Sequence, residues 1–79
     1  EEEIYAKELE YLISVAVEKM PSQRKQIYKM SRMEGLSNDE IAERLVISKR
    51  TVENHLTLAL ADIRKLIGFF IITYFGNIT

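Results

Sequence analysis

The sequence contains no cysteine, one histidine, one proline and three glycines. The absence of cysteine excludes disulfides, cysteine-based metal sites and a thiol nucleophile, and it agrees with a reducing, intracellular setting. His55 has no second histidine with which to build a metal site. There is no glycine-rich phosphate loop, and the acidic pairs fall where helix surfaces and caps are expected. We therefore expect no enzymatic activity and no cofactor.

Long apolar segments are also scarce. The longest run, residues 66–75, has about ten residues, whereas a membrane-spanning helix needs roughly 20. The chain begins with Glu1-Glu2-Glu3 instead of Met or a basic segment followed by an apolar one. We therefore expect a cytoplasmic protein without a secretory signal, and a chain that is part of a longer protein. Its 79 residues, 47% of them apolar, suffice for one small domain.

Charge is unevenly distributed along the chain, although the net charge is only −1. Residues 1–19 carry six Glu against two Lys, whereas residues 20–50 carry seven Lys or Arg against four acids. Residues 51–79 are balanced. An acidic first segment therefore precedes a mildly basic middle, which the net charge conceals.

Helical spacing of apolar residues recurs throughout, and strand signals are few. We expect an all-α, four-helix domain with a C-terminal helix-turn-helix. The expected divisions of this single domain, 1–79, are an acidic first helix at 1–19, a second helix at 22–34, a helix-turn-helix at 37–66 and an apolar tail at 67–79. Pro21 separates the first two helices, because proline cannot continue a helical hydrogen-bond ladder. Gly35 is suited to the left-handed conformation that closes the second helix.

The segment "GLSNDEIAERLVISKRTVENHL", residues 35–56, carries the strongest pattern. Ser37 and Glu40 form the S-x-x-E signature of a capping box at the start of a short helix. A turn at Val46-Ile47 follows, and Ser48 is suited to cap the next helix. Two helices joined by such a short turn match a helix-turn-helix.

Three small or branched apolar residues fix the expected geometry of that unit. Ala42 lies where the two helices cross closely, Ile47 inserts from the turn into the core, and Val52 seats the second helix on the first. The opposite face of the second helix then points outward. Its residues are Lys49, Arg50, Glu53, Asn54 and Thr57.

That outward face has the chemistry needed to read DNA. Arg or Lys can donate two hydrogen bonds to guanine, Asn can pair with adenine, and Glu can accept from cytosine. Ser48 and Thr51 are placed to contact phosphate, helped by the helix N-terminus. The alternative is that these side chains are simply a solvated helix face, but the apolar geometry favours DNA binding.

Residues 20–65, "MPSQRKQIYKMSRMEGLSNDEIAERLVISKRTVENHLTLALADIRK", resemble the C-terminal promoter-recognition domain (region 4) of sigma factors, closest to the extracytoplasmic-function type. The matching pieces are Pro21 with Arg24 before Ile27-Tyr28, Ser31-Arg32, Gly35-Leu36-Ser37, Glu40-Ile41-Ala42 and Thr51-Val52-Glu53-Asn54. The resemblance implies docking on the RNA polymerase core and reading of the minus-35 element by the last helix. It implies that Lys49, Arg50, Glu53, Asn54 and Thr57 face bases, while Ser48 and Thr51 touch phosphate. Positively charged positions of the second helix, such as Arg24 and Arg32, are further candidates.

Two departures from the family pattern stand out. Val46 occupies the position where a glycine usually makes the turn, so we expect an altered or strained turn. Residues 51–61 contain no Lys or Arg. Because phosphate neutralisation supplies most non-specific affinity, we expect weak DNA binding by this domain alone.

Two other functions remain open from the sequence. The helix-turn-helix output domain of response regulators and quorum-sensing activators has similar motifs, but the basic segment before Gly35 favours the sigma reading. A helical protein-interaction module is the second alternative, since exposed apolar patches mark contact sites. An anti-sigma protein is a further partner implied by the resemblance. The tail either closes the core or mediates homodimerisation through Phe69, Phe70, Ile72, Tyr74 and Phe75.

Overall fold

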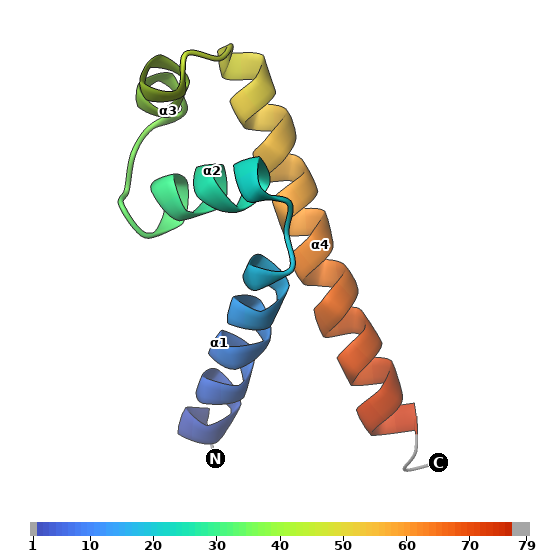
Figure 1. Ribbon diagram of the computed structural model, residues 1–79. Helices are drawn as coiled ribbons and strands as arrows, with labels where there is room; N and C mark the ends of the chain where they lie inside the picture. Colours follow the sequence, from blue (N-terminus) through green and yellow to red (C-terminus); the bar gives the residue numbers. More distant parts are fainter. Residues whose placement is uncertain (1, 77–79) are drawn as a thin grey trace.

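The chain folds into four helices and, within the described residues, no strands (Figure 1). The computed structural model describes the backbone of residues 2–76 and the side chains of residues 6–73. The helices are α1 (Glu2–Glu18), α2 (Ser22–Arg32), α3 (Asn38–Leu45) and α4 (Lys49–Gly76). The expected all-α fold with a C-terminal helix-turn-helix is therefore confirmed.

Helix α4 is the element on which the other three assemble. It contacts α1, α2 and α3, and its 28 residues make it about 42 Å long. In Figure 1, α3 lies beside the beginning of α4, α2 crosses its middle, and α1 packs lower down. Helices α1 and α4 diverge towards the end of the molecule where both termini lie. The result is an elongated molecule of 49 × 21 × 16 Å.

The apolar side chains form two separate clusters. The first core cluster joins α1 to the middle of α4 and contains Ala16, Val17, Met20, Ala59 and Ile63. The second core cluster joins α2 and α3 to the start of α4 and contains Ile27, Met30, Ile41, Ala42 and Val52. The second core cluster, which supports the beginning of α4, is thus built from the helix-turn-helix and from α2, the helix that precedes it.

Local sequence signals account for the breaks between helices. Helix α1 ends just before Pro21, and the backbone N–H of Lys19 donates to Val15 and Ala16 carbonyls, both at 3.2 Å. Helix α2 ends at Arg32, two residues earlier than expected from the sequence, and Gly35 follows with a φ of +70°. Only glycine adopts that backbone conformation at no steric cost.

The apolar tail expected at 67–79 is not a separate segment, because α4 continues without interruption through Gly68 to Gly76. The side chains of Tyr74 and Phe75 lie outside the described residues. Among residues 2–76, no helix combines the length and apolarity needed to cross a membrane.

Candidate nucleic-acid interface

The first helix of the helix-turn-helix begins with a complete capping box. The backbone N–H of Glu40 donates to the Ser37 hydroxyl at 3.1 Å, and the N–H of Ser37 donates to the Glu40 carboxylate at 3.1 Å. These bonds satisfy two N–H groups that a helix start leaves unpaired. The backbone N–H bond from Ser37 is also the main cause that lowers the pKa of Glu40. This end of α3 is therefore fixed by local interactions.

The turn between α3 and α4 contains a strained residue. Val46 has φ 56° and ψ 49°, the left-handed conformation that β-branched residues rarely adopt. The next backbone N–H, from Ile47, donates to the Ala42 carbonyl at 3.0 Å and closes the end of α3. Ile47 packs against the second core cluster, whereas the Val46 side chain is 89% exposed. The expectation of a strained turn at Val46 agrees with this geometry.

Ser48 caps the beginning of α4. The backbone N–H of Thr51 donates to the Ser48 hydroxyl at 3.0 Å, and the two hydroxyl oxygens of Ser48 and Thr51 are 2.8 Å apart. Both hydroxyls, which the resemblance implies as phosphate contacts, are thus already engaged with each other. Any contact with phosphate would use their remaining hydrogen-bonding capacity together with the free N–H groups at the helix start.

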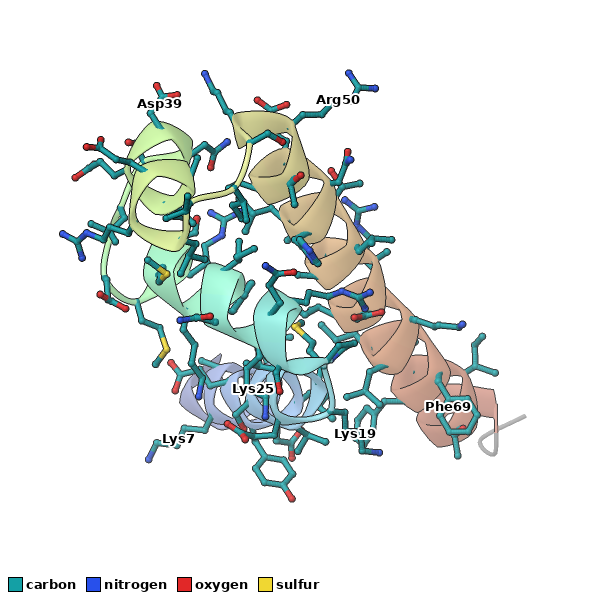
Figure 2. The ribbon with its side chains drawn as sticks, turned by 45° about the horizontal axis from the view of Figure 1, so that its top comes forward. Lys7, Lys19, Lys25, Asp39, Arg50 and Phe69 are labelled. Atoms are coloured by element: carbon teal, nitrogen blue, oxygen red, sulfur yellow. The ribbon has the colours of Figure 1, made fainter. Side chains whose placement is uncertain are left out.

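The outward face of α4 follows from the positions that it buries. Val52 and Ala59 are fully buried against the rest of the domain. The opposite side presents Arg50, Asn54 and Thr57, which are exposed and spaced by four and three residues along one stripe. Figure 2 shows Arg50 pointing away from the domain at the start of α4. The structure thus brings these three predicted residues together on one surface.

The remaining predicted residues lie beside this stripe. Glu53 is exposed, and its backbone carbonyl accepts a hydrogen bond from the Thr57 hydroxyl at 3.0 Å. Lys49 is exposed and lies 3.6 Å from the Asp39 carboxylate of α3. Such an exposed ion pair contributes little stability, so Lys49 can exchange Asp39 for a phosphate at small cost. This ion pair could not be predicted from local sequence patterns, because it joins two different helices.

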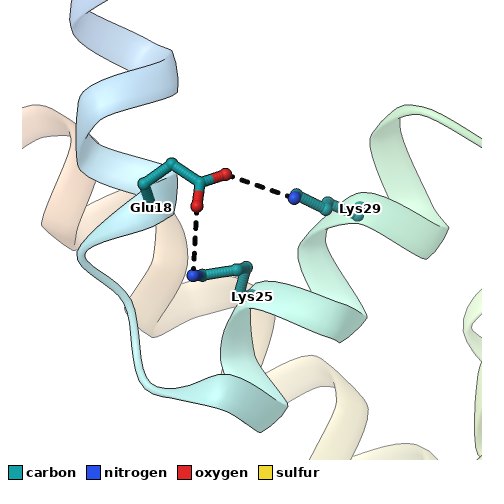
Figure 3. Close-up of polar contacts among 3 residues, drawn as sticks. All are labelled: Glu18, Lys25 and Lys29. Atoms are coloured by element: carbon teal, nitrogen blue, oxygen red, sulfur yellow. Dashed lines mark hydrogen bonds and ion pairs between the residues drawn. The ribbon is translucent and has the colours of Figure 1, made fainter.

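The basic charge of α2 is used inside the domain. Arg24 donates to the Asp62 carboxylate of α4 at 2.6 Å. Lys25 and Lys29 each donate to the Glu18 carboxylate of α1 at 3.3 Å (Figure 3). These two hydrogen bonds are the main causes that lower the pKa of Glu18. Arg24, a further candidate from the resemblance, thus links α2 to α4.

Two observations bear on catalysis and metal binding. His55 is half-buried, and its Nδ1 atom is buried without a hydrogen-bond partner among the described residues. Within that part of the chain, no group of three His, Asp or Glu side chains is arranged to hold a metal ion. The described side chains thus offer polar contacts on a convex helix face in place of an arrangement suited to metal binding.

Comparison with known proteins indicates the function of the outward face of α4. The family model described as "Sigma-70, region 4" matches residues 11–63, which include α2, α3 and the first half of α4. No curated protein and no solved structure matches the chain. Region 4 is a DNA-binding regulatory module and not a catalytic family. Because the match covers more than half of the sequence, the chain belongs to the sigma-70 region 4 family.

Proposed function

We propose that this domain recognises the minus-35 promoter element as part of an extracytoplasmic-function-type sigma factor and helps direct RNA polymerase to initiate transcription in the cytoplasm. The observation that carries the proposal is the exposed stripe of Arg50, Asn54 and Thr57 at the beginning of α4, in a chain of the region 4 family. In a helix-turn-helix, the N-terminal residues of the second helix contact base edges in the major groove. The RNA polymerase core is the partner, and an anti-sigma protein is a further one.

Each exposed side chain has a role in this proposal. Arg50 is suited to guanine, Asn54 to adenine and Glu53 to the amino group of cytosine. Lys49, Ser48 and Thr51 contact phosphate and fix the position of the helix on the duplex.

The electrostatics favour weak binding in isolation. Lys49 and Arg50 are the two cations in the first turn of α4, and residues 51–61 carry none. Two neutralised phosphates correspond to a salt slope of about −2 in a plot of log K against log salt concentration. The acidic side chains Asp39 and Glu40 at the start of α3 are both exposed. Polymerase is therefore expected to supply much of the affinity by holding the domain next to the promoter.

The test is a selection of random duplex DNA at low salt by the 79-residue chain, alone and tethered to core RNA polymerase. The proposal expects a short motif at minus-35 spacing, enriched in the tethered arrangement. A palindrome enriched without polymerase would favour the response-regulator alternative instead. No enrichment in either arrangement would contradict a DNA-reading role.

A pair of matched variants assigns the reading face. Arg50→Ala removes a cation from the proposed stripe, and Arg64→Ala removes another exposed cation from the same helix farther along. Loss of a bidentate contact to guanine costs about 1–3 kcal/mol and relaxes specificity at one position. Only Arg50→Ala should show this effect. Equal effects of the two variants would show that α4 attracts DNA by charge alone.

A further inference from the structure

The outward face of α4 changes from polar to apolar along the length of the helix. Arg64 and Lys65, both exposed, make it polar in the middle of the helix. Beyond them, Phe69 is 69% exposed, Ile71 47% and Ile72 74%. Residues 66–79 contain no charged side chain. This apolar end also lies beyond residues 11–63, which the region 4 family model matches.

Within residues 6–73, whose side chains the structure describes, the domain leaves Phe69 and Ile72 mostly uncovered. The inner side of α4 is already packed, since Leu66 and Ile67 contact the first core cluster on α1. Ile72 points away from that side, and Phe69, three residues earlier, lies between Ile72 and Leu66, with which it lines the same hollow. Beyond this point α1 and α4 diverge (Figure 1). A helix that is apolar on both sides is normally buried.

The molecule exposes more surface than a compact domain of its mass. Its accessible surface is 6084 Å². A compact monomer of 9.2 kDa is expected to expose about 4,900 Å². The excess of about 1,200 Å² is spread over the elongated molecule, and the apolar end of α4 contributes part of it.

The charges next to the apolar end favour a second copy as its occupant. Glu8 and Glu10 lie on α1 near the divergent end, whereas Lys19 and Lys65 lie farther back and line one shallow hollow with Phe69. Figure 2 shows Lys19 and Phe69 at this part of the molecule. If two copies pack end to end in antiparallel orientation, the acidic end of each lies beside the basic hollow of the other. The uncharged helix ends meet between them and need no complementary charge.

We propose that the face of α4 containing Phe69 and Ile72 pairs with the same face of a second copy in an antiparallel, two-fold symmetric homodimer. In such an isologous interface the same patch is used by both copies. The apolar side chains form its centre. The hollow of about 390 Å³ lined by Lys19, Lys65 and Phe69 receives the acidic end of the partner's α1. This inference does not depend on the proposed DNA contacts, which lie at the other end of α4.

The experiment is sedimentation equilibrium of the 79-residue chain from micromolar to millimolar concentration. We expect a reversible dimer. The double variant Phe69→Gln with Ile72→Gln should raise the dimer Kd by about tenfold or more, because central apolar anchors dominate interface energies. Leu58→Gln is the matched control, since Leu58 is an exposed apolar residue of the same helix outside the patch. It should leave the Kd unchanged.

Other results would overturn the proposal. A chain that stays monomeric at millimolar concentration contradicts it, as does a double variant that dimerises like the parent while circular dichroism shows it folded. A monomer that instead cosediments with lipid vesicles would show that a membrane surface occupies the apolar end. The variant Glu8→Lys with Glu10→Lys should weaken the dimer and reduce its dependence on salt. An unchanged Kd for this variant would overturn the antiparallel arrangement.

Discussion

Replacing Val46 with glycine should stabilise the domain, although valine is the larger and more apolar residue. Val46 holds φ 56° at the end of α3, in the left-handed region. Its side chain is 89% exposed, so truncation removes almost no packing. The substitution therefore isolates the free energy stored in one backbone conformation.

The expected gain follows from two opposing terms. An L-residue in the left-handed conformation costs roughly 1–2 kcal/mol. Glycine lowers stability by about 0.4–1 kcal/mol because it increases the freedom of the unfolded chain. The two ranges leave a net gain of between about 0 and 1.6 kcal/mol, centred near about 0.8 kcal/mol. For a domain of this size each kcal/mol changes Tm by roughly 4–8 °C, so Tm should rise by about 2–8 °C.

Thermal and urea unfolding followed by circular dichroism measure this gain. Gly35→Ala is the converse control, since Gly35 has φ +70° and an added Cβ would meet no atom within 4 Å. It should destabilise the domain by about 1 kcal/mol through the backbone alone. Val46→Ala should lie between the parent and Val46→Gly. If Val46→Gly leaves the free energy of unfolding unchanged or lowers it while Gly35→Ala behaves as expected, the turn at Val46 is not strained.

Three further predictions concern the reading face, the core and pH. Arg50→Ala should weaken DNA binding in the polymerase-tethered assay with an almost unchanged Tm, because its side chain is exposed; a large drop in Tm would show a structural role. Ala42→Leu should cost about 1–3 kcal/mol by overpacking the second core cluster, and a variant with parental stability and DNA binding would refute the close helix crossing. Lys25 and Lys29 hold the pKa of Glu18 below its ordinary value of 4.5. The stability from this contact is therefore present above that value and is lost as pH falls through the lower folded pKa. Glu18→Gln should lower Tm near neutral pH, and the difference from the parent should shrink as the pH falls through the lowered folded pKa of Glu18; a difference that stays constant across an acid titration would contradict the ion-pair assignment.

The fold was predictable because its signals are local. The capping box at Ser37, the break at Pro21 and the closing glycine at Gly35 each depend on neighbouring residues. The inner faces of α2 and α3 also follow from helical spacing, since Ile27 and Ile41 are fully buried. The division of the core into two clusters was not predicted, because it depends on how far apart α1 and α2 contact α4.

The candidate site was only partly accessible from sequence. Helical spacing identified the outward stripe of Arg50, Asn54 and Thr57, whose exposure the structure describes, while the DNA contacts remain a prediction. The partners of the charged residues were not accessible, because Arg24–Asp62 joins residues far apart in the chain. The sequence has an excess of basic residues at 20–50, which suggested many cations available for DNA. Three of the basic side chains of α2, namely Arg24, Lys25 and Lys29, instead pair with acids of the domain.

The continuity of α4 has a consequence for regulation. From Arg50 to Ile72 the helix rises by about 33 Å without interruption. A molecule bound at the apolar end is thus too far away to shield the DNA-contacting residues by itself. It can act on the DNA-contacting residues only by fixing the orientation of the rigid helix α4, and with it the direction in which the beginning of the helix points. Control through this end would therefore change which DNA the domain can reach and leave the affinity of the contacts themselves intact.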